Sequence, residues 1–249
     1  MFTDHFSALA NAYASRRPHY PEELFHYLSS VCRRHELAWD CAAGSGQATI
    51  PLTRYFRHVV ATDASQAMLA QAPSHPQVEY RLATAESSGL AAAGADLVTV
   101  AQALHWLRAD EFYREADRVL APGGVLAAWT YGTQVVEGET LNRLLQEFYT
   151  DVVGPYWAPE RCHVESGYRT LPFPYPEVAP PHFTMEEQWT LDDLLGYLGT
   201  WSATQSFRQA NHRDPVEDLA RELAPWWGDP SRARLVRWPL SLRLGAKPT

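Results

Sequence analysis

The chain has 249 residues, of which 46% are hydrophobic and 20% are charged, so it is long and apolar enough to bury a large core. Its 21 basic and 29 acidic side chains give a net charge of −8, which argues against a surface that neutralises nucleic-acid phosphates. It contains neither an apolar run long enough to cross a membrane nor the basic and apolar regions of a secretion signal at its start. The composition therefore predicts a cytoplasmic protein that binds neither nucleic acid nor membrane.

The cysteine pattern gives no sign of a disulfide framework or a metal site. Cys32, Cys41 and Cys162 are odd in number and are not spaced as C-x-x-C pairs. No histidine stands at a repeating ligand distance from them. We therefore expect reduced thiols and no bound metal.

The first half of the chain alternates between predicted helices and predicted strands. Apolar residues between Glu22 and Glu36 recur with the helical period, and Pro21 begins that helix. Apolar and β-branched runs then predict five strands, over 37–42, 58–62, 78–83, 95–101 and 125–131. Between them, helices are predicted to start near Gln47, to cover 65–72, and to run through Phe112 until Pro122-Gly123-Gly124.

This alternation predicts an α/β fold, with a doubly wound, Rossmann-like sheet that is mostly parallel and has helices on both faces. Further along the chain, a strand is expected over 183–189 and helices over 191–201 and 216–227. Apolar residues alternate with polar ones from Val236 to Leu244, which predicts a half-buried, antiparallel strand near the C-terminus. Pro239 should face an edge or a bulge of that strand, because proline donates no hydrogen bond.

The regular spacing stops between residues 132 and 181. Seven prolines are interleaved there with seven aromatic residues. Such a segment is either a rigid surface loop packed on itself or a cap over a substrate. We therefore predict a single domain over 1–249 with an insertion at 132–181.

A glycine turn after the first strand is the first candidate binding site. Gly44 and Gly46 either make a tight turn only or let the backbone approach a ligand closely. A dinucleotide-binding fingerprint needs a small residue where Thr49 stands, so the match to a dehydrogenase is incomplete. Asp63 closes the next strand, 17 residues after Gly46, where it either caps the helix from Ser65 or binds both hydroxyls of a ribose.

Five segments carry a resemblance to a known family. Residues 40–48 resemble the first motif of class I S-adenosylmethionine-dependent methyltransferases, and 59–63 resemble the second; matches to later segments follow in order at 81–86, 97–106 and 118–124. The opening Phe6-x-x-x-Ala10-x-x-Tyr13 and Arg17-Pro18-x-Tyr20-Pro21, together with His105-Trp106, look like the type 11, trans-aconitate methyltransferase-like branch, which acts on small molecules. The sequence departs from the common pattern at Cys41, at Ala42-Ala43 and at Thr84, where an acidic residue often faces the adenine.

The resemblance implies an enzyme that transfers a methyl group from S-adenosylmethionine to a small acceptor by in-line displacement. It implies that Asp40, Ala42 and Gly44 hold the methionine part, that Asp63 holds the ribose, and that Thr84, Ala85 and Glu86 border the adenine. Ala101 and Gln102 would lie beside the sulfonium, and the predicted cofactor set is completed by Gly46, Ala64 and Met68.

The acceptor site is predicted from residue types. A carboxylate acceptor needs no base, whereas a phenol or an amine does, so His105 either lines the pocket or removes a proton. Arg161 and Arg169 are candidates for gripping a carboxylate, as is Arg208, if they are not simply exposed. Trp106 and Tyr131 either line the acceptor site or pack in the core. The N-terminal segment that contains Tyr13, Arg17 and Tyr20 either covers the ligand or packs on the sheet.

Two other functions also fit these residues. An NAD-dependent oxidoreductase shares the glycine turn and the acidic residue after the second strand. A binding module could keep the fold and the cofactor site without catalysing a reaction. The sequence carries no signal for the oligomeric state.

Overall fold

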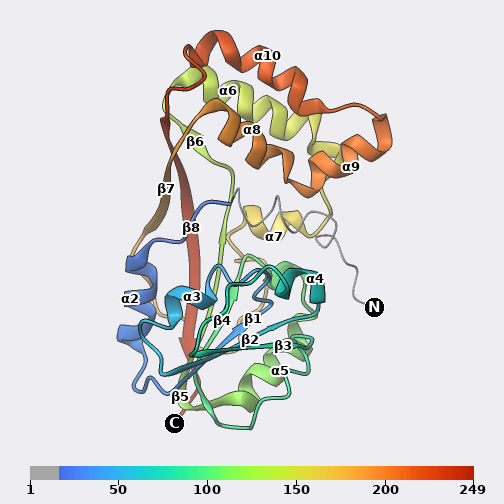
Figure 1. Cartoon of the computed structure of the whole chain (residues 1–249). Helices are drawn as coiled ribbons and strands as arrows, with labels where there is room; N and C mark the ends of the chain where they lie inside the picture. Colours follow the sequence, from blue (N-terminus) through green and yellow to red (C-terminus); the bar gives the residue numbers. More distant parts are fainter. Residues whose placement is uncertain (1–16) are drawn as a thin grey trace.

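The computed structural model describes residues 17–249, with a sheet at one end of the molecule and a group of helices at the other (Figure 1). Within these residues the sheet has eight strands, in the order β3-β2-β1-β4-β5-β8-β6, with β7 also paired to β8. The strands are β1 (Leu37–Cys41), β2 (His58–Asp63), β3 (Val78–Leu82), β4 (Ala95–Ala101), β5 (Leu120–Tyr131), β6 (Val135–Val136), β7 (Phe183–Trp189) and β8 (Arg234–Ala246). Strands β1 to β5 are parallel and β8 is antiparallel to β5, so the predicted fold class is confirmed.

Helices cover both faces of the parallel part of the sheet. One face packs against α2 (Glu22–Val31) and α3 (Thr49–Leu52), and the other packs against α5 (Ala109–Val119). Neighbouring residues of β1 point to opposite faces, so Ala38 joins the first apolar cluster and Trp39 joins the second. Two covered faces explain the nearly continuous apolar sequence of β4, whose first six residues are all buried.

Strand β5 begins earlier than the sequence predicts. The helix ends at Val119, and Leu120 already belongs to the strand. The Pro-Gly-Gly sequence forms an irregularity inside β5, where the pairing with β4 shifts register between Ala95 and Leu97. A Cβ atom at Gly124 would lie 2.9 Å from the Ala121 carbonyl oxygen, so a glycine is required at this irregularity.

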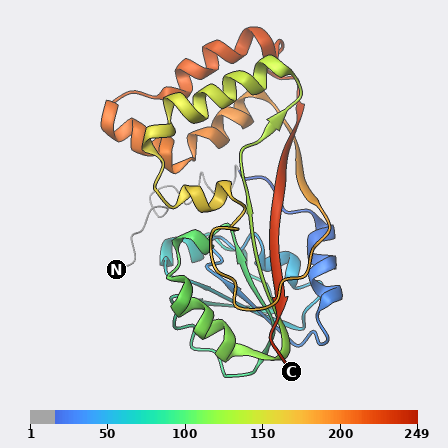
Figure 2. The same ribbon diagram turned by 180° about the vertical axis from the view of Figure 1, so that it is seen from behind.

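Four helices form the end of the molecule opposite the sheet, and together we call them the helical cap (Figures 1 and 2). In the cap α10 packs against the other three; the members are α6 (Glu139–Glu147), α8 (Leu191–Gly199), α9 (Ser202–Asn211) and α10 (Pro215–Trp227). Both views show β8 running from the sheet to the cap. Helices α8 and α10 agree with the prediction, whereas α9 was not predicted.

The segment 132–181 is more regular than its prolines suggest. It contains β6, α6, a π-helical turn (Phe148–Val152), a 3₁₀ turn (Gly154–Tyr156) and α7 (Arg161–Glu165). Helix α7 lies between the cap and the sheet (Figures 1 and 2). The interpretation of this segment as an insertion with a capping role stays a prediction, and α8 to α10 follow it in the chain.

Pro239 lies inside the long strand β8. It pairs with Thr184 of β7 on one side. On the other side of β8, the residues from Leu240 onward pair with β5, and Val236 and Arg237 pair with β6. Pro239 lies between these two paired stretches. The gap gives β8 a local edge, where a proline removes no ladder hydrogen bond.

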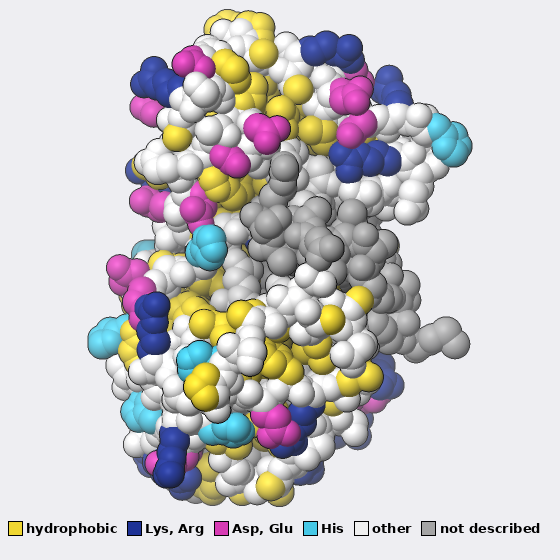
Figure 3. Space-filling model, viewed as in Figure 1, with side chains coloured by type: hydrophobic (Ala, Val, Ile, Leu, Met, Phe, Trp, Pro, Cys, Tyr) yellow, Lys and Arg dark blue, Asp and Glu magenta, His cyan; other side chains and the backbone are white. Residues whose placement is uncertain are grey.

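The surface shows no concentration of charge of one sign on the face seen in Figure 3, where acidic and basic side chains are interspersed at both ends of the molecule. Among the described helices, none is both long and apolar enough to cross a membrane. Across residues 17–249, no three His, Cys, Asp or Glu side chains gather as metal ligands.

Candidate active site

Two adjoining cavities lie at the carboxyl ends of the parallel strands. The larger has a volume of about 600 Å³ and is lined by the loops that follow β1, β2, β3 and β4. The smaller, of about 50 Å³, lies between those loops and the helical cap. The two share four lining residues, namely Gln102, Trp106, Tyr131 and Ala158. The carboxyl ends of the strands are where doubly wound sheets bind ligands.

The glycine turn and Asp63 meet at the floor of the larger cavity. The Gly44 amide donates to Oδ2 of Asp63 at 2.8 Å, and the Ser65 amide donates to Oδ1 at 2.8 Å. Gly44 has a φ of +58°, and a Cβ atom there would lie 3.3 Å from Cε of Met68. The turn and the carboxylate therefore lie side by side, as the sequence predicts.

Most of the predicted cofactor residues line the larger cavity: Ala42, Gly44, Asp63, Ala64, Met68, Thr84, Ala85, Glu86, Ala101 and Gln102. Tyr20 also lines it. Glu86 lies at the side of the loop after β3, where Oε1 is 3.5 Å from Nε of Arg108. These residues come from four separate loops, and the sheet brings them to one side of the molecule.

Asp40 and Gly46 belong to the predicted set but do not line the cavity. Asp40 is fully buried, and its carboxylate accepts hydrogen bonds from Thr49 Oγ1 at 2.6 Å and Thr99 Oγ1 at 2.9 Å. Burial raises the pKa of Asp40 to about 6. Gly46 packs against Tyr80, whose hydroxyl would lie 2.9 Å from a Cβ atom at this position. Both residues support the turn from within the protein.

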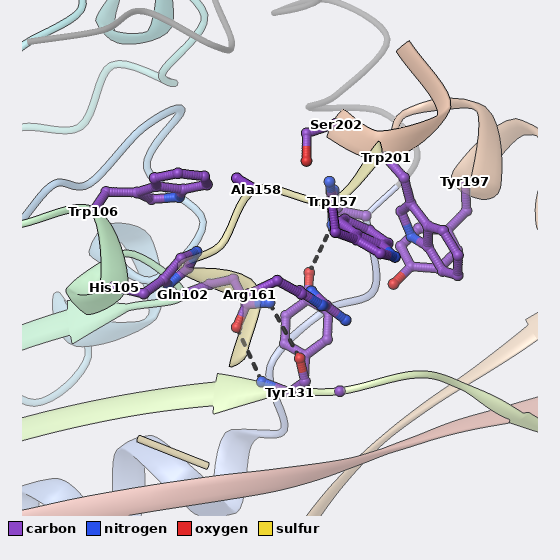
Figure 4. Close-up of a pocket in the computed structure, with 12 residues that line it drawn as sticks. Gln102, His105, Trp106, Tyr131, Trp157, Ala158, Arg161, Tyr197, Trp201 and Ser202 are labelled. Carbon is purple, nitrogen blue, oxygen red and sulfur yellow. Dashed lines mark hydrogen bonds between the residues drawn. The ribbon is translucent and has the colours of Figure 1, made fainter. Parts of the chain in front are cut away.

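Gln102 forms the wall between the two cavities. Its backbone is in the left-handed region with a φ of +55°, which is uncommon for a residue other than glycine. Its Oε1 accepts from Thr130 Oγ1 at 2.6 Å and from the Tyr131 amide at 3.0 Å, and its Nε2 donates to the Tyr131 carbonyl at 3.2 Å (Figure 4). The end of β5 therefore fixes this side chain in one orientation. Ala42, after β1, has a similar φ of +54°.

The smaller cavity has aromatic walls and basic side chains. Its aromatic residues are Trp106, Tyr131, Trp157, Tyr197 and Trp201 (Figure 4). Arg17 and Arg161 also line it, and no described lining residue carries a carboxylate. The buried indole N–H of Trp157 has no hydrogen-bond partner within the described residues. The cavity therefore offers positive charge and hydrogen-bond donors between flat apolar surfaces.

Arg161 is held by aromatic neighbours. Its Nε donates to the Tyr149 hydroxyl at 2.9 Å, and its guanidinium carbon lies 4.4 Å from the centroid of the Trp157 ring. Both Nη groups are without a hydrogen-bond acceptor among residues 17–249. Arg17 donates from Nη1 to the Tyr131 hydroxyl at 3.2 Å and lies over the Tyr197 ring. The geometry leaves the planar fork of Arg161 available to an anion.

The other arginine candidates lie elsewhere. Arg169 is exposed and lines neither cavity. Arg208 binds Asp214 Oδ2 at 2.6 Å and the Gly199 carbonyl, so its charge is already paired within the cap. Tyr13 lies outside the described residues.

His105 lines the smaller cavity directly after β4. Its Nδ1 lies 3.0 Å from the Tyr168 hydroxyl. Burial, with the nearby charges of Arg161 and His163, lowers the pKa of His105 to about 3, so the ring is neutral at physiological pH.

Several lining residues escaped the sequence analysis. Trp157, Ala158 and Glu160 come from the Pro- and aromatic-rich segment, where a capping role was one of the two interpretations. Tyr197 comes from α8, Ser202 is the first residue of α9, and Trp201 lies between the two helices. Their local pattern is that of a packed helix, and only the fold places them opposite Gln102.

The model of the methyltransferase domain family matches residues 39–128. A protein of Dictyostelium discoideum that carries the name methyltransferase is 32% identical over 225 residues, which are 89% of this chain and 86% of that protein. The chain belongs to the class I S-adenosylmethionine-dependent methyltransferases.

Solved structures agree with this assignment. A protein from Anaeromyxobacter dehalogenans, described as a type II methyltransferase, is 44% identical, with a TM-score of 0.88 over 94% of this chain and 99% of that one. A second structure, from Bacillus halodurans, shares the fold at 19% identity, with a TM-score of 0.50 over 90% of this chain and 99% of its own. The comparisons give no support to an NAD-dependent oxidoreductase or to a non-catalytic module.

Proposed function

We propose that this methyltransferase binds S-adenosylmethionine in the larger cavity and methylates a small, carboxylate-bearing acceptor held in the smaller one. The observation that carries the proposal is the wall of Gln102, Trp106 and Tyr131 that both cavities share. Because the two cavities adjoin at these residues, a methyl group and an acceptor atom that meet at their border can be held in line.

The residues of the larger cavity fit the cofactor. A volume of about 600 Å³ lies within the range of small-molecule sites. The carboxylate of Asp63 lines this cavity, and a carboxylate can accept hydrogen bonds from a ribose diol. Gly44, with its left-handed backbone, places no side chain beside it. Thr84, Ala85 and Glu86 would border the adenine, while Ala101 and Gln102 would lie beside the reacting methyl group. When bound, S-adenosylmethionine supplies a methyl group on a sulfonium, whose positive charge disappears on transfer.

The chain's own residues provide alignment and exclude water. A carboxylate acceptor, with a reference pKa of about 4, is ionised at neutral pH and needs no base. Arg161 can grip it through both Nη groups, and Arg17 adds a second positive charge. The aromatic walls of the smaller cavity exclude water around the acceptor. Burial lowers the pKa of His105 to about 3, which makes it a weak base and matches a reaction that requires no proton removal.

Labelled methyl transfer to a matched panel of acceptors tests the proposal. The purified protein is incubated with methyl-labelled S-adenosylmethionine and with small carboxylic acids, each paired with the carboxamide and the amine of the same skeleton. We expect label on the acids only, in base-labile methyl esters. Transfer to the amines or to phenols instead would overturn the carboxylate assignment, and no transfer to any class of acceptor would overturn the proposed activity.

A further inference from the structure

Tyr168 follows α7, and its hydroxyl contacts His105 of the smaller cavity. It is fully buried, and its φ of +64° lies in the left-handed region, which is unusual for a bulky residue. The preceding Gly167 lies against β8, where a Cβ atom would come within 2.7 Å of Ser241 Oγ. Arg243 of β8 donates from Nη1 to the Tyr168 carbonyl at 2.6 Å. Strand β8 therefore fixes the backbone that aims the phenol at His105.

The buried phenol of Tyr168 has one hydrogen-bond partner among the described residues, which is Nδ1 of His105. Burial raises the pKa of Tyr168, so the phenol keeps its proton. If an Nδ1–H group donated to this oxygen instead, the phenol hydrogen would be buried without an acceptor among the described residues, which is costly. The Tyr168 proton therefore points to His105 Nδ1, which lies 3.0 Å away.

This arrangement decides which ring nitrogen of His105 carries hydrogen. A neutral imidazole has one N–H, so acceptance at Nδ1 leaves the hydrogen on Nε2. His105 Nε2 has no hydrogen-bond partner within the described residues, and it is not buried. It is therefore open to the cavity that His105 lines. The positive charge of Arg161, from α7, opposes a second proton on the ring.

We propose that Tyr168 is a positioning residue that fixes His105 as the neutral Nε2–H tautomer. In this form His105 donates a hydrogen bond to the substrate that receives the methyl group, and it does not act as a base. The tautomer follows from the geometry of the protein alone. Only the identification of the receiving atom as an acceptor oxygen rests on the proposed function.

Nitrogen NMR of the ligand-free protein tests the tautomer without any activity. Uniformly ¹⁵N-labelled protein at pH 7 should show the His105 resonances, assigned by their loss in His105→Gln, with a hydrogen-bearing Nε2 and a bare Nδ1. In Tyr168→Phe we expect the two tautomers to mix. Tyr113→Phe removes a matched hydrogen bond, from a tyrosine hydroxyl to the Pro172 carbonyl, and should leave the His105 signals in place. Hydrogen on Nδ1 in the wild-type protein would overturn the proposal.

Kinetics separate a donor from a base. The glutamine amide in His105→Gln can replace the Nε2–H donor, so kcat/KM should stay within about tenfold of wild type, whereas His105→Ala should lose about 10- to 100-fold. The rate of wild type should not follow a histidine titration between pH 6 and 8. Equal losses in both variants, together with a histidine-like fall in the wild-type rate below pH 7, would identify His105 as a base. If no acceptor is methylated at all, the proposed function fails while the NMR result still stands.

Discussion

At the scale of single residues, burial separates side chains that the sequence treats alike. Asp40 and Asp63 occur on neighbouring strands, and the resemblance assigns both to the cofactor. Thr49 and Thr99 occupy the carboxylate of Asp40, while Asp63 remains at the cavity. The sequence shows both aspartates, but not that Thr49 folds back onto one of them. In the same way, Arg161 and Arg169 look equivalent in sequence, and only the first lines a cavity.

Arg161→Lys is the sharpest test of acceptor binding by a single residue. Lysine keeps the charge but loses the planar fork and the stacking on Trp157, so KM for the acceptor should rise at least about tenfold while kcat changes less. Arg169→Lys, at an exposed site outside both cavities, is the matched control and should leave both constants as in wild type. Steady-state kinetics with varied acceptor decide the matter, and equal behaviour of the two variants would argue against Arg161 as the anion-binding residue.

The pH dependence of stability follows from His105. Its folded pKa, about 3, lies below its unfolded value, about 6.5, so between these values the unfolded chain binds the extra proton. Its contribution to stability is therefore fully present above pH 6.5 and is lost as the pH falls toward 3. Between pH 7 and 5, wild type should lose about 1–2 kcal/mol more unfolding free energy than His105→Gln. Urea unfolding measures this difference, and parallel losses would show that His105 titrates normally.

At the scale of elements, the alternation of strands and helices is predictable because local periodicity records burial. Strands β1 to β4 lie within a residue of their predicted ends. For β1, β2 and β4 the reason is that both faces are covered and the sequences are mostly apolar. The start of β5 was wrong for a physical reason. Pro122-Gly123-Gly124 resembles a helix stop, and the structure uses these residues for an irregular strand pairing next to Ala95.

Gly124→Ala tests this reading of β5. The added methyl group would press on the carbonyl oxygens of Ala121 and Ala95 at 2.9 and 3.0 Å, and backbone cannot move aside cheaply. We expect a loss of about 1–3 kcal/mol in unfolding free energy. Gly94→Ala is the control, because its new methyl would lie 3.6 Å from the nearest atom and should cost within about 0.5 kcal/mol. Similar midpoints in urea for the two variants would contradict the assignment.

At the scale of the whole molecule, the acceptor cavity exists only because distant segments meet. The sequence locates the cofactor loops well, since each follows a predicted strand. It does not locate Trp201 or Ser202, because helix α9 (Ser202–Asn211) has few apolar residues and is held by packing such as that of Phe207 on Tyr156. The cap also combines a helix that precedes β7 in the chain, α6, with three helices that follow it, α8 to α10. No local sequence pattern shows that these helices pack together.

Calorimetric titration with S-adenosylhomocysteine tests the central claim most directly, namely that Asp63 and the glycine turn form the floor of a nucleoside site. Wild type should bind one equivalent, and Asp63→Ala should bind at least about 30-fold more weakly, because it loses charge-assisted hydrogen bonds to the ligand and the tie to Gly44. Asp192→Ala, on the exposed side of α8, should bind as wild type does, and unfolding curves should show that all three proteins are folded. No binding by wild type, or unchanged affinity in folded Asp63→Ala, would contradict the account.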